Sequence, residues 1–234
     1  MGFTIGAIGG LNGIREFREL RPGSRRRSRA SECTAVAEYT GLWGWPVVPG
    51  ARALRTGGGR SARVECSCGA RACPAPGAHP LDASLEIPAG ATLDEASEAW
   101  GAVPGAAVLL PTGRAFDVIE VAEGAGHQAL VRLERMGLPL GPVAVAPTGR
   151  AWFFVAPGAA AELPELLYRM GWDDAGLDLR GLGEGDHITA PPSDMAGLGQ
   201  VRWLRPPTLE AAGRPPQARL LLGTLAYVCN RQSG

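Results

Sequence analysis

The stretch AAVLLPTGRAFDVIEV, residues 106–121, predicts two apolar β-strands separated by the turn Pro-Thr-Gly-Arg. A segment of similar construction, VAVAPTGRAWFFV, covers residues 143–155. Between them a helix is expected over residues 126–136, because Leu130 and Leu133 recur at helical spacing. The string PTGRA thus occurs twice, and we predict two hairpins of similar construction.

Strands and helices intermix irregularly along the rest of the chain. Without a regular βαβα alternation, the pattern favours an α+β fold with a mixed or antiparallel sheet over a doubly wound fold. Neither of the phosphate-binding patterns GxGxxG and GxxxxGKS/T occurs. The other expected helices begin near Ser31, at a capping box at residues 92–95, and near residues 162 and 217, and the other expected strands lie near residues 47–48, 177–179 and 187–189.

The charges of the chain balance. The 23 basic residues, all Arg, are matched by 23 acidic ones. A molecule without net charge is not attracted as a whole to a polyanion, so nucleic-acid binding would need a local basic patch. No apolar run approaches the roughly 18 residues of a membrane span. The first Arg follows the apolar N-terminal residues, the reverse of a secretory signal. We therefore expect a cytoplasmic protein that does not cross a membrane.

Three regions are expected along the sequence. Residues 1–30 form a Gly-rich arm ending in an Arg-rich run, which either touches nucleic-acid phosphates or is a solvated leader. Residues 31–205 form the folded domain, with a cysteine-rich insertion at residues 66–80. Residues 206–234 comprise a proline-punctuated linker and a C-terminal helix.

Three of the five cysteines lie within eight residues and precede a histidine, in the pattern C-x-C-x4-C-x5-H. Thiolates and imidazole suit a tetrahedral Zn²⁺ ion, and four ligands predict a closed, structural site. The alternative is a loop with incidental free thiols. Cys33 and Cys229 lie on helical patterns and are expected to be buried hydrophobic residues. The predicted zinc ligands are Cys66, Cys68, Cys73 and His79.

Several strings occur in an order that is typical of one family. They are Gly44-Trp-Pro-Val47, the knuckle at residues 66–80, Leu110-Pro-Thr-Gly113, Asp178-Leu-Arg-Gly181, Ile188-Thr-Ala-Pro-Pro-Ser193 and Val201-Arg-Trp203. Over about residues 31–205 the chain resembles the bacterial and phage-type bifunctional DNA primase/polymerase N-terminal domain of the archaeo-eukaryotic primase superfamily. The resemblance implies an α+β fold with an RRM-like sheet, packed helices and a small zinc-bearing insertion. It also implies template-directed nucleotidyl transfer with Mg²⁺ or Mn²⁺, and DNA and nucleoside triphosphates as partners.

The resemblance implies two catalytic acids, Glu120 and Asp178. The family's first motif, two acids separated by one residue on a strand, falls at Glu120 and Ala122, which share one face of the strand. The third motif's acid is Asp178, which could instead cap a strand end. Because an unpaired charge within an apolar strand is costly, the expected partner of Glu120 is Arg180 or a metal ion.

The resemblance also implies phosphate-binding residues, Arg150 and Arg180. The second motif, a histidine after a Gly-rich turn that contacts the nucleotide phosphates, falls at Ala151. Arg150 beside it can still bind phosphate, because guanidinium suits that ligand. The aromatic run at residues 152–154 is interpreted as core, with a base-stacking platform as the alternative.

With alanine at two motif positions, we expect nucleotidyl transfer to be impaired or lost in a domain that keeps the family's framework. The competing hypothesis is a non-catalytic module on the same fold that binds nucleic acid, a nucleotide or another protein. A hydrolase triad is not expected, because His127, His187 and Ser193 lie outside any nucleophile motif.

Overall fold

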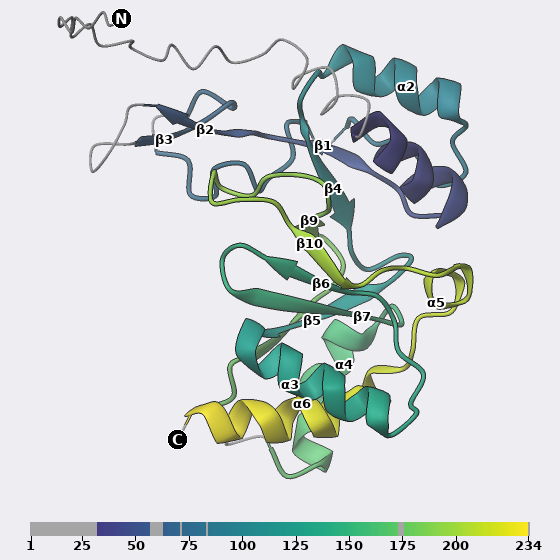
Figure 1. The fold of residues 1–234 in the computed structure, drawn as a ribbon, viewed down its shortest axis with the longest axis vertical. Helices are drawn as coiled ribbons and strands as arrows, with labels where there is room; N and C mark the ends of the chain where they lie inside the picture. Colours follow the sequence, from purple (N-terminus) through teal and green to yellow (C-terminus); the bar gives the residue numbers. More distant parts are fainter. Residues whose placement is uncertain (1–31, 57–62, 71, 83, 173–175, 234) are drawn as a thin grey trace, which may run out of the picture.

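The structure is a computed structural model that describes residues 32–56, 63–70, 72–82, 84–172 and 176–233 (Figure 1). The expected arm over residues 1–30 and the predicted N-cap Ser31 lie outside the described residues. Two larger antiparallel sheets, a two-stranded antiparallel ribbon and several helices make up the described part of the fold, which confirms the α+β prediction.

The larger sheet has five strands, in the order β10-β6-β7-β5-β8, and every neighbouring pair is antiparallel. Three helices, α3, α4 and α6, cover one of its faces (Figure 1). The first six elements of the larger sheet and its helices follow one another along the chain in the order βαββαβ. They are β5 (Asp117–Ala122), α3 (Glu123–Arg135), β6 (Val143–Ala146), β7 (Arg150–Val155), α4 (Ala159–Arg169) and β8 (Leu179–Leu182), and β10 (Arg202–Arg205) and α6 (Ala218–Ser233) complete this part.

The smaller sheet has three antiparallel strands in the order β1-β4-β9. Its strands come from distant parts of the chain, and two helical segments pack beside it (Figure 1). The strands are β1 (Val48–Gly50), β4 (Ala107–Pro111) and β9 (His187–Thr189). The helical segments are a helix over residues 32–37 that continues into the short π-helix η1 (Glu38–Leu42), and α2 (Leu93–Ala102). A two-stranded ribbon of β2 (Ala53–Thr56) and β3 (Arg63–Cys66) and a short helix, α5 (Leu209–Gly213), are peripheral.

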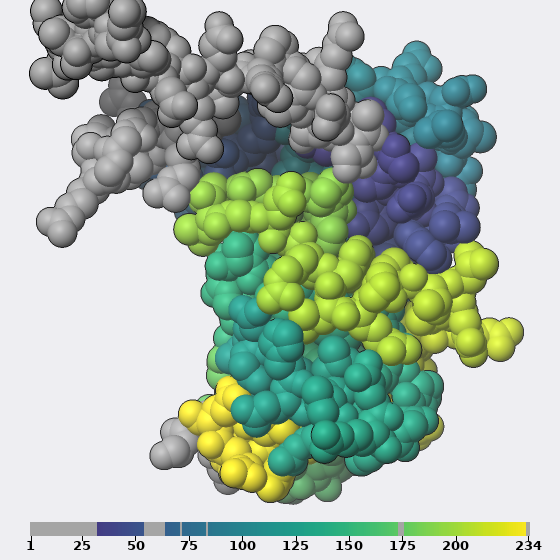
Figure 2. Space-filling view, viewed as in Figure 1, coloured from purple at the N-terminus to yellow at the C-terminus, as the bar shows by residue number. Residues whose placement is uncertain are grey.

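A shared aromatic core joins the two sheets. Phe154, on the face of the five-stranded sheet opposite the helices, stacks on Trp45 with ring centroids 5.4 Å apart and lies 4.4 Å from Phe116. These rings are buried, and Trp203 of β10 also packs against Phe154, with ring centroids 5.6 Å apart. Figure 2 shows that the light-green segment after β9 crosses the molecule between the two sheets with their helices. Most of the sheet's second face is therefore interior.

The first PTGR turn does not form the predicted hairpin. β4 and β5, on either side of it, belong to different sheets. The backbone N–H of Thr112 donates to the Asp186 carbonyl at 3.0 Å, and a Cβ on Gly113 would lie 2.5 Å from the Cα of Glu184. Packing against this distant segment directs the chain from one sheet to the other. The second PTGR turn does connect paired strands, β6 and β7, as predicted.

Most other predicted elements are confirmed within a few residues. The capping box is complete, since Thr92 Oγ1 accepts from the Glu95 backbone N–H and the Glu95 carboxylate accepts from the Thr92 N–H. The strand expected at residues 177–179 begins later, at Leu179. Cys229 is buried as expected, whereas Cys33 is only partly buried. Among the described residues, no helix combines the length and the apolar character that a membrane span requires.

Candidate functional site

Glu120 lies in the middle of β5, between the neighbouring strands β7 and β8. In the strand register its partners are Trp152 on β7 and Arg180 on β8. Directly opposed residues of antiparallel strands share a face, so these three side chains emerge together on the face away from the helices. Glu120 is only 5% exposed.

Donors surround the buried Glu120 carboxylate. Arg180 Nε and Arg150 Nε donate to its Oε1 at 2.8 and 3.1 Å, and the Trp152 indole Nε1–H donates to Oε2 at 2.8 Å. A buried carboxylate requires such pairing, because an uncompensated charge in the interior costs several kcal/mol. The expected partnership of Glu120 with Arg180 is confirmed.

Arg150 links Glu120 to the second predicted acid. Its Nη1 and Nη2 donate to the two carboxylate oxygens of Asp178 at 2.6 and 2.8 Å, a bidentate pair. The hydrogen bonds from Arg150 hold the pKa of Asp178 below its usual range, and those to Asp178 raise the pKa of Arg150. Asp178 therefore serves as an ion-pair partner. The four predicted residues form one cluster of two carboxylates and two guanidinium groups, which we call the Glu120 cluster, with a formal charge of zero.

Residue 151 does not face this cluster. Ala151 is fully buried on the helix-covered face, and a Cβ on Gly126 of α3 would lie 2.4 Å from the Ala151 Cβ. Residue 151, to which the resemblance assigns the histidine position of the second motif, therefore does not face the Glu120 cluster, because strand alternation turns it to the opposite face. Trp152 occupies the place opposite Glu120 instead. Sequence reasoning missed Trp152 as a site residue, although period-two alternation puts it on the same face as Arg150.

Replacing Ala151 with histidine is expected to destabilise the fold without creating a site. The larger side chain would have to fit beneath α3 where even a second methyl group is excluded, and overpacking of this kind costs about 1–3 kcal/mol. Urea unfolding measures the change. The control Ala102→His, at an exposed position of α2, should change the free energy of unfolding by less than about 0.5 kcal/mol. Equal stability of the two variants would contradict the assigned face of Ala151.

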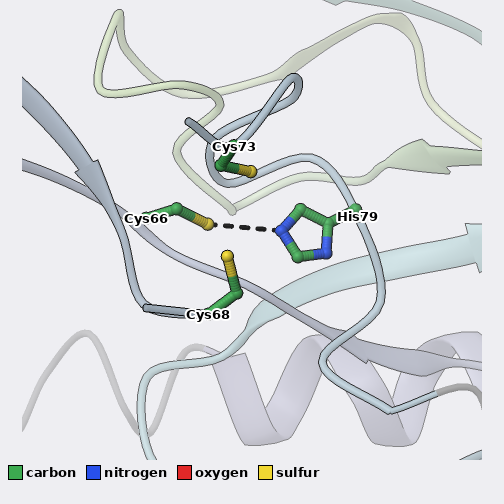
Figure 3. A group of neighbouring side chains, drawn as sticks. All are labelled: Cys66, Cys68, Cys73 and His79. Atoms are coloured by element: carbon green, nitrogen blue, oxygen red, sulfur yellow. Dashed lines mark hydrogen bonds between the residues drawn. The ribbon is translucent and has the colours of Figure 1, made fainter. Parts of the chain in front are cut away.

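A second cluster gathers the four predicted metal ligands. Figure 3 shows Cys66, Cys68, Cys73 and His79 converging, and their ligand atoms all lie within 4.8 Å of one another. Cys66 Sγ is 3.3 Å from His79 Nε2. His79 Nδ1 lies 2.8 Å from the Pro80 carbonyl oxygen. Since a carbonyl can only accept, Nδ1 carries the proton, and the lone pair of Nε2 is directed at the sulfur atoms.

The cysteine loop is tied to the smaller sheet. The Ala51 N–H donates to the His79 carbonyl at 2.8 Å, and Gly50 forms a bridge with Pro80. Burial acts to raise the pKa of the Cys66 thiol, but hydrogen bonds from the backbone of Cys68 and Gly77 and from the Cys68 side chain lower it to about 6. The cluster therefore offers a ready thiolate, two further sulfur atoms and an imidazole nitrogen, a donor set that can bind a tetrahedral metal ion.

The remaining aromatic and polar candidates have structural roles. Trp152, Phe153 and Phe154 are all buried. Their burial confirms the interpretation as core residues, and the alternative of a base-stacking platform is wrong. His187 Nε2 contacts the Ala78 carbonyl at 3.1 Å, and Ser193 Oγ accepts from the Val108 N–H at 2.7 Å.

Comparison with known proteins gives one match. The family model described as bifunctional DNA primase/polymerase, N-terminal, matches residues 36–218, which agrees with the resemblance predicted from the sequence. No curated protein and no solved structure matches the chain.

Proposed function

The chain belongs to the bifunctional DNA primase/polymerase N-terminal family, and from this premise we propose that it binds nucleotide or DNA phosphates without catalysing nucleotidyl transfer. Membership suggests interaction with DNA and nucleotides. In this proposal the protein retains the interaction with DNA or nucleotides. It lacks the divalent-metal chemistry, in which Glu120 and Asp178 would hold Mg²⁺ or Mn²⁺.

One observation carries this proposal: Arg150 lies between the two acids that would hold the metal ions. Both oxygens of Glu120 already accept hydrogen bonds, and Asp178 is held in a bidentate pair. Two-metal catalysis needs several free carboxylates around ions about 4 Å apart. The position that would supply another carboxylate on this face is Ala122, which lies opposite Arg150 in the register. A divalent cation would have to displace a guanidinium group to bind.

Arg180 is the residue best placed to contact phosphate. Its side chain is 65% exposed, whereas that of Arg150 is 24% exposed. An exposed guanidinium can form paired hydrogen bonds with a phosphate while Glu120 fixes its orientation. Nucleotide or single-stranded DNA would then approach the sheet at the β8 side of the Glu120 cluster.

We further propose an RRM-like sheet and a zinc ion. The βαββαβ order with the strand order β6-β7-β5-β8 supports an RRM-like arrangement. Three sulfur donors and one imidazole favour zinc over the oxygen-seeking cations. Bound there by four protein ligands, zinc would join the end of β3 to the loop that follows it and would leave no position for a reacting water. A cytoplasmic location and binding of another protein through the same module stay predictions.

Primer extension tests the proposal. Purified protein with a primed template, labelled deoxy- and ribonucleotides and Mn²⁺ is expected to give no extended product, while labelled oligonucleotide or nucleotide still binds. Arg180→Ala should weaken that binding about tenfold or more, because a hydrogen bond to a charged group contributes about 1.5–3 kcal/mol.

Arg169→Ala is the matched control, since Arg169 is also exposed and paired with a carboxylate, Glu165, but lies away from the Glu120 cluster. It should leave binding unchanged. Extension by the unaltered chain that is abolished by Asp178→Ala, in a variant that remains folded, would establish catalysis and overturn the proposal. Absence of both extension and binding would leave no support for a phosphate site.

A further inference from the structure

A second surface, separate from the Glu120 cluster, lies between α3 and α6. Figure 2 shows α6, in yellow, against the teal helix α3 at the base of the molecule. Between the helices is a groove of about 450 Å³, which we call the α3–α6 groove, and its lining is mainly apolar. It is lined by Arg132, Arg135, Met136, Gly223, Thr224 and Tyr227.

The groove carries positive charge in a chain whose net charge is zero. Among the described residues, no carboxylate lies within ion-pair distance of Arg132, Arg135 or Arg231, although six other arginines have such partners. The helix α6 contains no acidic residue at all. Unpaired arginines gathered around one groove favour an anionic occupant.

Tyr227 is held at the centre of these charges. The Arg132 guanidinium carbon lies over its ring, 4.9 Å from the centroid, and that of Arg231 is 6.0 Å away. Hydrogen bonds from Arg231 and Arg132 lower the pKa of the phenol. Because guanidinium groups already engage its ring, Tyr227 is not a free platform on which a nucleobase could stack.

Gly223 of α6 also indicates that the α3–α6 groove is a binding surface. It lies inside α6, where glycine is less favourable than alanine, and a Cβ at this position would meet nothing within 4 Å. Among the described residues, no neighbour requires its small size. The absence of a side chain there keeps the floor of the groove open, beside the half-exposed Met136, a flexible side chain that adapts to apolar partners.

We propose that the α3–α6 groove docks an acidic segment of a partner protein, with an apolar side chain on the floor and flanking carboxylates on Arg132, Arg135 and Arg231. An apolar floor and engaged tyrosine favour such a peptide over nucleic acid, which would offer phosphates without an apolar anchor. This docking does not depend on the phosphate site proposed above.

A displayed library of random short peptides, selected on the full chain, tests the inference. Enriched peptides are expected to carry Asp or Glu beside a large apolar residue. Synthesised and titrated, they should bind the double variant R132E/R135E at least tenfold more weakly. Gly223→Leu should also abolish binding without lowering the thermal unfolding midpoint, because it fills the groove with a good helix former.

Arg169→Glu on the exposed face of α4 is the charge control and should leave peptide affinity unchanged, as should Arg180→Ala. The inference is overturned if no acidic peptide is enriched, or if enriched peptides bind R132E/R135E as tightly as the unaltered chain. Loss of labelled oligo-dT binding in R132E/R135E, without any peptide that depends on the groove, would identify a nucleic-acid surface and would equally overturn it.

Discussion

Glu120→Ala is expected to lower the free energy of unfolding by about 2–4 kcal/mol. The substitution removes the acceptor of the Trp152 indole N–H, which lies in the interior, and a buried donor without a partner costs about 1–3 kcal/mol. It also leaves Arg150 and Arg180 with one carboxylate, Asp178, instead of two. Urea unfolding followed by tryptophan fluorescence measures the change.

Glu165→Ala is the control, because Glu165 forms an exposed pair with Arg169 on α4. Exposed pairs contribute about 0–1 kcal/mol, so this variant should unfold close to the unaltered chain. Glu120→Gln should fall between the two, since the amide keeps an acceptor for one donor but not the charge. If Glu120→Ala were as stable as Glu165→Ala, the Glu120 cluster would not organise the centre of the sheet.

Cys66→Ser is expected to abolish tight zinc binding. The thiolate at residue 66 lies at the end of β3 and is the buried member of the cysteine cluster. Loss of a residue that merely supports a metal ligand already weakens binding ~10–100-fold, and loss of a ligand should exceed that. Metal analysis of the purified protein should find about one zinc in the unaltered chain and almost none in Cys66→Ser or Cys73→Ser.

Structural consequences should follow from the loss of zinc. The loop around residues 66–80 should become sensitive to proteases, because metal binding and folding are coupled in small metal sites. Cys33→Ser, at a cysteine outside the cluster, should retain its zinc and its resistance. Full zinc content in both Cys66→Ser and Cys73→Ser would contradict the zinc assignment.

The sequence predicted what is decided locally. The cysteine cluster could be found because its four ligands lie within one short segment whose spacing alone lets them meet. Glu120 could be matched with Arg180 because a charge within an apolar strand needs a nearby cation. The hairpin at the second PTGR turn followed from the turn and the flanking strands.

Features that depend on contacts between residues far apart in the sequence could not be predicted from it. Two identical PTGR turns differ because only the first packs against residues 183–186, a contact that no local pattern reveals. The placement of Trp152 directly opposite Glu120 needed the register of β7 against β5. The role of Arg150 as a link between Glu120 and Asp178 needed three strands, β5, β7 and β8, to be placed side by side.

The interleaving of the two sheets affects how this chain can fold during its synthesis. β9, which pairs with β4, is separated from it in sequence by β5, β6, β7 and β8, all of which belong to the other sheet. The N-terminal half therefore leaves the ribosome with one strand edge unpaired until residues 187–189 have emerged. Pairings between such distant segments form slowly, because the intervening chain must first be ordered. The strands β5, β6, β7 and β8, which follow one another along the chain, are expected to pair first and to provide the surface on which the smaller sheet is completed.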